Sequence, residues 1–376
     1  MEKKLKIRNF ICFITFIFIN IFVLIEFLLR KNTVNYYNAA TFLISYKNGF
    51  ISRGFIGTIL NLIPQQKYLI AIGFVTGIGT VIFTAFLLKQ VFHIFFERMD
   101  ENVCYWFLFM MVSSAALHFT FRHSHTKMDL FWYLLFIPIF TSFLNFKEKK
   151  IRNIIFLFLF SIISILIHQG FIFVIAPFIF VLLWDSDEKK ILIPYALTIG
   201  ITFLLCQFFG KGDFQLIATE ALNKVNTVFY YDQETAWGYI KRMLYMEYSM
   251  SIFEHFKVLK KEFINVNFKL FLYLSSLNIL NIYVLFKVFI YTFKNKTKLY
   301  IPFLALTQLP LYLLTIDYER WFILFLLNLQ LLIIYKLRKG EKVEMLAPAK
   351  YMALFFVLNV IAVVYIQFRF GVQVIQ

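Results

Sequence analysis

The chain has 376 residues, of which 61% are hydrophobic and 20% aromatic, and its formal net charge is +17. A soluble domain is nearer half apolar, and the excess here forms runs long enough to cross the ~30 Å hydrocarbon core of a bilayer. The composition excludes an ordinary soluble protein. We assign the positive charge to cytoplasmic loops rather than to a nucleic-acid surface, because Lys and Arg collect in such loops.

The apolar runs, taken in chain order, predict about eleven spanning helices. They cover residues 10–29, 68–88, 103–120, 130–146, 153–168, 171–184, 191–209, 268–291, 299–316, 321–336 and 348–368. The first run follows a basic start and is too long for the core of a signal peptide, so we expect a retained helix. A shorter apolar piece at 54–63, ended by Pro64, predicts a half-helix or an interfacial helix. The expected fold is an all-α, polytopic transmembrane bundle that forms a single domain over residues 1–376.

Loop charge predicts the orientation of this bundle. Short basic loops contain Lys147, Lys149, Lys150, Arg152, Lys189, Lys190, Lys294, Lys296, Lys298, Arg338, Lys339 and Lys342. These basic loops alternate along the chain with loops that lack such short basic clusters. The positive-inside rule therefore puts the basic loops, and the N-terminus, in the cytoplasm. The remaining polar segments then share the outer face. Charged groups near hydrocarbon usually line the bundle interior or a water-filled cavity, so we expect one external site at membrane level.

The segment 210–267 is too long for a simple connection and mixes aromatic with charged residues. Residues 238–261 have a helical, amphipathic periodicity. We expect a long external loop with amphipathic helices, which either rest on the membrane or cover a substrate. Tyr231 and Trp237 in this loop, and Trp321 beyond it, are candidates to stack on sugar rings or to anchor at the headgroups.

Four cations of the outer face are candidates to bind phosphate groups. Arg53 lies in "NGFISRGFIG", Arg122 and Lys127 lie in "RHSHTKMD", and Arg320 lies in "DYERW". Arginine offers a bidentate fork and lysine a point charge. The alternatives are an Arg53 that snorkels to headgroups, a plain basic loop at 122–127, and a tight turn around Arg320.

Three residues are candidates to accept a proton. Asp317 is three residues before Arg320, so on a helix the two share a face and could pair. His168 ends an apolar run before Gly170 and serves either as a base or hydrogen-bond donor, or as a structural residue. Asp129 opens a predicted helix, where it is also a natural N-cap.

Several chemistries have no motif in this chain. There is no P-loop, GxSxG, HExxH or paired CxxC, and no cytoplasmic loop is long enough for a nucleotide-binding domain. The three cysteines lie in apolar runs, and the alternating His123 and His125 lack an acidic partner of recognised metal spacing, so we expect no metal. We also expect no cofactor, and a substrate that is activated in the membrane.

Three motifs resemble those of bacterial O-antigen and capsular polysaccharide repeat-unit polymerases. "NGFISRGFIG" is similar to their Asn-Gly…Arg-Gly-x-x-Gly element, "RHSHTKMDLF" to an Arg…Asp element, and "DYERW" to an Asp-aromatic-x-Arg-Trp element. Relatives often have Gly at the position of Glu319. A His-Glu pair is expected at His168-Gln169, where this chain has Gln, which removes a carboxylate from that position.

The resemblance implies a glycosyltransferase that joins undecaprenyl-pyrophosphate-linked oligosaccharide units on the outer face of the bacterial cytoplasmic membrane. Arg53, Arg122 and Arg320, supported by Lys127, would neutralise the departing pyrophosphate, and no metal would be required. Asp317, His168 or Asp129 would accept the proton. Its partners would be the lipid-linked oligosaccharide, membrane lipids, a flippase and a chain-length regulator.

Other functions fit part of the pattern. A GT-C-like glycosyltransferase with a polyprenyl-phosphate sugar donor would show the same cations, but such enzymes usually carry acidic residues in the first external loop, and residues 30–53 have none. A lipid-linked glycan transporter or flippase would carry midplane charges and repeat symmetry. Only Glu26 and Lys287 lie inside apolar runs, each near an end. A membrane acyltransferase would use His168 as its base.

Overall fold

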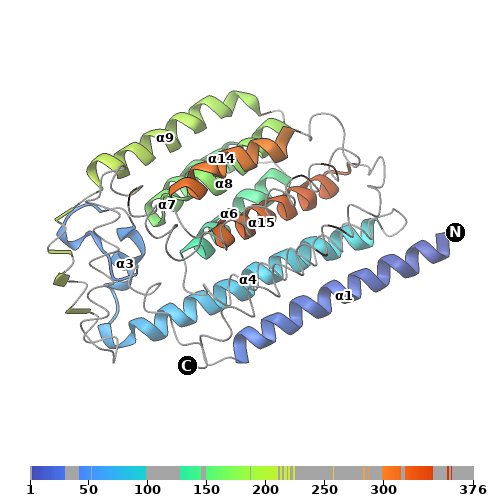
Figure 1. Cartoon of the computed structure of the whole chain (residues 1–376), viewed down its shortest axis with the longest axis horizontal. Helices are drawn as coiled ribbons and strands as arrows, with labels where there is room; N and C mark the ends of the chain where they lie inside the picture. Colours follow the sequence, from blue (N-terminus) through green and yellow to red (C-terminus); the bar gives the residue numbers. More distant parts are fainter. Residues whose placement is uncertain are drawn as a thin grey trace. The chain divides into compact units, whose positions relative to one another are not determined.

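The computed structural model describes residues 2–29, 42–51, 53–98, 128–144, 150–186, 188–210, 299–314 and 318–341, and also residues 212, 213, 216, 217, 219, 220, 223, 224, 257, 283, 287, 354 and 357. The elements formed by these residues are helices joined by turns (Figure 1). Their contacts divide the chain into two compact units. Unit 1 comprises Met1–Leu29, Thr84–Arg122 and Leu259–Gln376, and unit 2 comprises Arg30–Phe83 and His123–Val258. A single membrane domain over the whole chain remains a prediction.

The helices lie where the apolar runs predict them. They are α1 (Glu2–Leu29), α3 (Gly54–Leu60), α4 (Tyr68–Glu97), α6 (Asp129–Leu144), α7 (Lys150–Ile167), α8 (Phe171–Asp185), α9 (Leu192–Phe209), α14 (Tyr300–Leu314) and α15 (Tyr318–Arg338), with 3-10 turns η1 (Tyr46–Asn48), η2 (Gln65–Lys67) and η4 (Lys189–Ile191). The predicted helices 103–120, 268–291 and 348–368 lie outside the described residues.

Two boundaries differ from their predictions, because α1 begins at Glu2 rather than near residue 10 and α4 ends later than expected. We expected the second helix to end near residue 88 and a cytoplasmic loop to follow, but α4 continues to Glu97. The helix continues because its apolar spacing does: Val91, Ile94 and Phe95 are buried while Phe96 and Glu97 are exposed. Its 30 residues span about 45 Å, which exceeds the hydrocarbon thickness and lets a charged end project beyond it.

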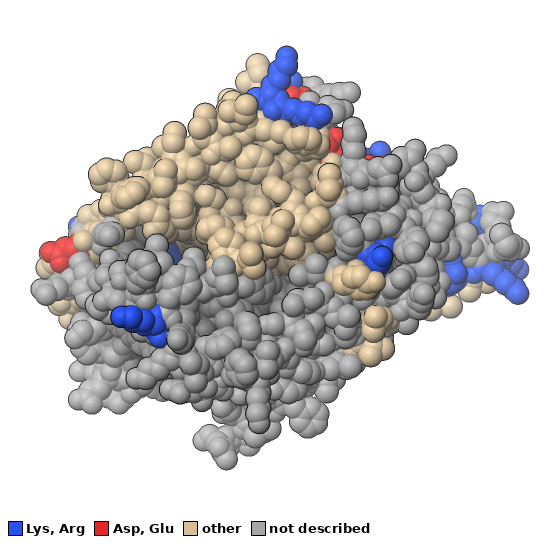
Figure 2. Space-filling model, turned by 45° about the horizontal axis from the view of Figure 1, so that its top comes forward, with Lys and Arg blue, Asp and Glu red and all other residues tan. Residues whose placement is uncertain are grey.

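Length and composition support a membrane protein. Among the described residues, the segments long and apolar enough to cross a bilayer are Gln65–Glu97, Lys150–Ile167 and Lys189–Phe209. Shorter apolar helices cover Asp129–Leu144, Phe171–Asp185 and Tyr300–Leu311. Figure 2 shows a broad uncharged surface with charged residues gathered at its margins. The count of eleven spans, the orientation and the identity of the membrane remain predictions.

Unit 2 is built around α8, most of whose residues are buried. Helix α6 packs against α7 and α8, and α9 packs against α7 and α8. Between α7 and α9, the hydroxyls of Ser161 and Tyr195 lie 3.1 Å apart in a hydrogen bond. At one end of this unit, Lys150 Nζ lies 2.8 Å from a carboxylate oxygen of Glu188, which joins the start of α7 to the α8–α9 connection. The exposed face of α9 is strongly apolar, as expected for contact with lipid; it includes Ile193, Leu197, Ile201, Leu204 and Phe208.

Unit 1 contains α1, the second part of α4, α14 and α15. The Phe13 ring of α1 stacks on Phe95 of α4 with centroids 4.0 Å apart. Helix α15 packs against α14 and is buried over 323–337, including the amides of Asn328 and Gln330. A helix that is buried on all sides belongs in the interior of a bundle rather than at its lipid-facing surface.

Candidate functional site

Arg53 lies in a sharply bent loop at the start of α3. The bend is made at two positive φ angles, 103° at Gly49 and 68° at Arg53. The second of these positions is Arg53 itself rather than Gly54, the glycine that follows it. A left-handed conformation costs an L-residue with a β-carbon roughly 1–2 kcal/mol, and such strain is often kept at functional sites. The strain at Arg53 therefore favours a role for this side chain beyond packing.

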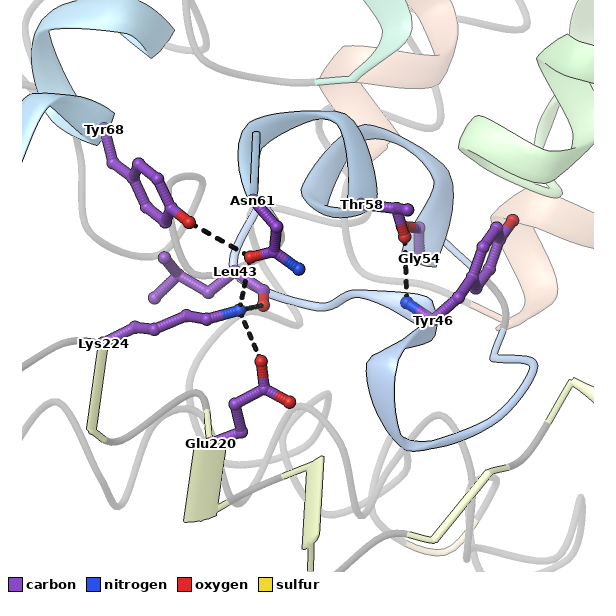
Figure 3. Close-up of polar contacts among 8 residues, drawn as sticks. All are labelled: Leu43, Tyr46, Gly54, Thr58, Asn61, Tyr68, Glu220 and Lys224. Atoms are coloured by element: carbon purple, nitrogen blue, oxygen red, sulfur yellow. Dashed lines mark hydrogen bonds and ion pairs between the residues drawn. The ribbon is translucent and has the colours of Figure 1, made fainter. Parts of the chain in front are cut away.

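The glycines of "RGFIG" allow close backbone packing. A Cβ at Gly57 would lie 1.9 Å from the carbonyl oxygen of Ile44, and one at Gly54 would lie 2.5 Å from the Tyr46 ring. Thr58 Oγ1 accepts the Tyr46 backbone N–H at 2.9 Å and donates to the Gly54 carbonyl at 2.7 Å (Figure 3). Helix α3 is thus pressed against residues 42–46.

A hydrophobic cluster seats α3 within unit 2. Its buried residues are Phe42, Ile72, Met128 and Ile167, and Phe55, Ile56 and Leu60 of α3 pack against them. Met128 directly precedes Asp129, and Ile167 directly precedes His168. The segments that carry Arg53, Asp129 and His168 therefore meet at one end of unit 2, which we call the α3 end.

His168 is held between α7 and α8 in a defined orientation. Its Nδ1 accepts the Gly170 backbone N–H at 3.0 Å, and its ring makes an edge contact with Trp132 at a centroid distance of 5.0 Å. A nitrogen that accepts a hydrogen bond carries no proton, so the neutral ring carries its proton on Nε2. This geometry favours a hydrogen-bond donor over a general base among the predicted roles.

Gln169, at the position where the resemblance expects Glu, has a partner from another helix. The Gln207 side-chain N–H of α9 donates to the side-chain oxygen of Gln169. The pair ties the α7–α8 turn to the end of α9. The amide therefore makes an interhelical contact here, and this contact was not foreseen from the sequence.

Asp129 is the first residue of α6 and is 4% exposed. We expected it to be an N-cap, but the helix begins at Asp129 itself and Met128 precedes it. A carboxylate in the first turn is stabilised by the helix dipole. A buried carboxylate in an apolar unit is costly unless it is compensated, so its retention beside the hydrophobic cluster is compatible with either a structural or a catalytic role.

A polar node at the α3 end was missed from the sequence. Lys224 is 3% exposed, and its Nζ donates to Asn61 Oδ1 at 2.9 Å and to the Leu43 carbonyl at 3.4 Å. Glu220 forms an ion pair with it at 2.7 Å, and the Tyr68 hydroxyl donates to the same Asn61 oxygen at 3.0 Å (Figure 3). We call these residues the Lys224 node. The i,i+4 spacing of Glu220 and Lys224 is a sequence signal for their pairing, but the partners 163 and 181 residues away have none.

Tyr46 is a second residue that the sequence did not reveal. Its hydroxyl oxygen is buried and makes no hydrogen bond within the described structure. Burial, and to a smaller extent the nearby Cys206, raises the pKa of Tyr46 to about 12. At neutral pH the phenol is therefore protonated, and it is available as a donor to a ligand.

Of the remaining predicted residues, the structure describes Arg320 and Trp321, which belong to unit 1. Arg320, in unit 1, has its guanidinium 4.5 Å from the centre of the Trp321 ring, and Trp321 is 2% exposed. This stacking orients the guanidinium, whereas a sugar would need an exposed ring face. Arg122, Lys127, Asp317, Tyr231 and Trp237 lie outside the described residues. In the described parts of the chain, no three His, Cys, Asp or Glu side chains are grouped to hold a metal.

The comparisons with known proteins provide no relative. No protein-family model matches the chain, and no curated protein or solved structure matches it.

Proposed function

We propose that this chain is a bacterial membrane polymerase that joins undecaprenyl-pyrophosphate-linked oligosaccharide units into a surface polysaccharide. One observation carries the proposal. Arg53 is held in a strained loop, and the segments bearing Arg53, Asp129 and His168 meet at one end of a unit whose helices are apolar. A cation at the end of apolar helices suits a substrate whose charged pyrophosphate is attached to a membrane-embedded lipid.

The proposed reaction is a substitution at an anomeric carbon. A hydroxyl of one lipid-linked unit attacks the anomeric carbon of the glycan carried by another lipid. A glycosidic C–O bond forms while the C–O bond to the pyrophosphate breaks, and undecaprenyl pyrophosphate leaves with the bonding electrons. The hydroxyl proton passes to a protein base. The reaction takes place on the outer face of the cytoplasmic membrane.

The proposed roles follow from the chemistry of each group. Arg53 and Arg320, with Arg122 and Lys127, neutralise the charge that develops on the departing pyrophosphate. Asp317 or Asp129 accepts the hydroxyl proton. His168 donates a hydrogen bond from Nε2, because Nδ1 already accepts the Gly170 N–H. The role for Tyr231 and Trp237 is to stack on sugar rings. A flippase that supplies the units and a chain-length regulator are the proposed partners.

Deletion of the gene tests this reaction class. The surface glycan of the deletion strain is resolved on a gel, and its lipid-linked precursors are extracted and assigned to a membrane face. A polymerase predicts complete single repeat units on the outer face. A truncated unit would instead indicate the GT-C-like glycosyltransferase, and complete units on the cytoplasmic face would indicate the flippase. Glycans of normal length would reject all three.

Substitution of the arginines tests the site. Arg53→Ala and Arg320→Ala should each abolish long chains while the protein stays at wild-type levels in the membrane. Arg152→Ala is the matched control, because Arg152 is exposed at the start of α7, with its guanidinium over the Phe156 ring. Long chains from both Arg53→Ala and Arg320→Ala would show that these residues do not carry the reaction.

A further inference from the structure

The ammonium of Lys224 is fully engaged by the protein itself. A lysine ammonium has three N–H bonds. The Lys224 Nζ lies 2.9 Å from Asn61 Oδ1, 3.4 Å from the Leu43 carbonyl and 2.7 Å from Glu220 Oε1. Three oxygen atoms therefore surround the ammonium, two as hydrogen-bond acceptors and one as an ion-pair partner, in a side chain that is 3% exposed. This cation is suited to hold protein segments together rather than to bind a substrate anion.

The acceptors of Lys224 flank the loop that carries Arg53. Leu43 lies just before η1, and Asn61 directly follows the last residue of α3. The residues between them include both positive-φ positions, Gly49 and Arg53. One side chain from the long polar segment thus holds the two ends of a strained loop, as Figure 3 shows for the node itself.

A second contact of the same segment lies at the bend, and the residues between are locally ordered. Ile217 is 3% exposed, and its backbone N–H donates to the Asp213 carbonyl at 2.9 Å. A Cβ on Gly49 would lie 3.9 Å from the Cα of Gly212, so the two backbones are close at the bend. The segment therefore meets the loop at two places, Gly212 and the Lys224 node, and the node is the more polar of them.

A buried ion pair is weak evidence for stability, because desolvation offsets much of the attraction. The importance of the Glu220–Lys224 pair lies instead in the chain segments that the Lys224 ammonium connects. The ammonium binds Asn61, whose side-chain oxygen also accepts the Tyr68 hydroxyl at the start of α4. The ammonium thus joins the end of α3 to the residues before η1 directly, and Asn61 extends the node to α4.

We propose that Lys224 is a positioning residue, which holds the Arg53 loop in its bent form from the first turns of the long polar segment. The attachment itself does not depend on the reaction. Its consequence, that Lys224 sets the affinity of Arg53 for a lipid pyrophosphate, rests on the proposed function.

Hydrogen exchange of the detergent-purified full chain tests the attachment. Lys224→Met keeps the aliphatic stem and removes the ammonium, and it should raise amide exchange over residues 42–62 about tenfold. Exchange over α7 and α8 should stay unchanged. Lys67→Met is the matched control, because Lys67 lies before α4 and is exposed. Unchanged exchange over residues 42–62 in Lys224→Met would overturn the proposal.

Ligand binding tests the positioning. The probe is undecaprenyl pyrophosphate in detergent micelles, titrated against wild type, Arg53→Ala, Lys224→Met, Lys224→Arg and Lys67→Met. We expect Lys224→Met to weaken binding about tenfold and Lys224→Arg to restore part of it, because arginine keeps the charge and the donors. Wild-type affinity in Lys224→Met, with weakened binding in Arg53→Ala, would overturn the positioning role.

The two experiments separate the inference from the proposed function. If the wild-type protein does not bind the probe but Lys224→Met still loosens residues 42–62, the attachment stands and the pyrophosphate chemistry is rejected. If the probe binds in an Arg53-dependent manner but neither exchange nor affinity responds to Lys224→Met, the proposed function stands and the role of Lys224 is rejected.

Discussion

Two buried lysines, one in each unit, use their charge in different ways. Lys224 in unit 2 is 3% exposed and Lys336 in unit 1 is 2% exposed, and each pairs with a nearby glutamate. The Lys336 Nζ lies 2.6 Å from Glu341 Oε1, and the Arg98 guanidinium donates to the Glu341 backbone carbonyl at 2.6 Å. Beyond the glutamate, Lys224 binds neutral oxygen atoms of a strained loop, while Lys336 belongs to a group of charged side chains at a helix end.

The end of α15 in unit 1 is a regular helix terminus. The Glu341 N–H donates to the Lys336 carbonyl, the Gly340 N–H donates to the Leu337 carbonyl, and Gly340 has a φ of 82°. This is the Schellman pattern, with glycine in the left-handed position. Arg338 pairs with Glu97 at 3.5 Å, so cations lie at the C-terminus of the helix, where its dipole favours them.

The two helix ends differ in the residue that takes the left-handed conformation. At the end of α15, the left-handed position is occupied by glycine, which bears it at little cost. At the start of α3, the left-handed position is occupied by an arginine, and the loop is held by residues distant in sequence. A protein that needed only a turn at the start of α3 would be more stable with glycine at residue 53. The α3 end of unit 2 is therefore the better candidate for function, and the following predictions test this view.

The largest effect is expected at Gly57. A Cβ there would lie 1.9 Å from the Ile44 carbonyl oxygen, so Gly57→Ala should lower the free energy of unfolding by on the order of 3 kcal/mol. Thermal unfolding in detergent measures it. Gly77→Ala in α4 is the control, because its Cβ would have nothing within 4 Å, and its stability should stay level or rise by up to about 1 kcal/mol. Equal stability of the two variants would refute the close packing of α3.

Removal of the Lys336 ammonium should have the next largest effect. Lys336→Met leaves Glu341 without its partner, but that carboxylate side chain is 38% exposed, which reduces the loss to about 1–2 kcal/mol. Unfolding by denaturant measures the loss. Surface glycans from cells with wild-type amounts of this variant should keep their length, since Lys336 lies at the C-terminal end of α15, sixteen residues after Arg320. Shortened glycans from correctly folded protein would give this end a functional role and reverse the comparison.

Arg53→Gly should separate folding from activity. Glycine accepts the φ of 68°, so the folded state should gain about 1 kcal/mol, less the entropy that glycine adds to the unfolded chain. Arg53→Ala keeps the strain and should show no such gain. Both variants should lose long glycan chains. A glycine variant that is less stable than wild type would show that the Arg53 side chain contributes more to folding than its backbone strain removes.

The smallest effect on stability is expected at His168. An asparagine oxygen can replace Nδ1 as acceptor for the Gly170 N–H, so His168→Asn should change the free energy of unfolding by no more than about 1 kcal/mol. It lacks the Nε2–H and should lower polymer yield at least about tenfold if that donor contacts the substrate. His168→Gln, which restores a donor at greater reach, is the paired variant. Full activity of His168→Asn would leave His168 with the structural role alone.

The helix positions could be predicted because the apolar runs alone define them. A run of apolar residues has few stable alternatives in a membrane, since each backbone N–H and C=O must be hydrogen-bonded within the segment. The error at the end of α4 came from reading Lys89 and Gln90 as a loop, although Val91, Ile94 and Phe95 continue the buried stripe to Glu97. Polar residues inside a helix can be tolerated where they face other helices or the membrane boundary.

The candidate site could be predicted only in part. Arg53, Asp129 and His168 are rare polar residues beside apolar runs, and this contrast marks them in the sequence. The tautomer of His168 was not predictable, because it depends on the Gly170 N–H that the α7–α8 turn directs at Nδ1. The buried hydroxyl of Tyr46 was not predictable either, because its pKa of about 12 reflects burial by the fold.

The sequence by itself determined a helical, membrane-type chain, the order of its helices and the glycine spacing that lets α3 pack closely. Local apolar patterning carries that information. Only the tertiary structure decided that Lys224 binds Asn61 and Leu43, and that Arg53 rather than Gly54 takes the left-handed conformation. These features arise from contacts between residues more than 160 positions apart and from the way α3 is pressed on its neighbours, so no local pattern encodes them.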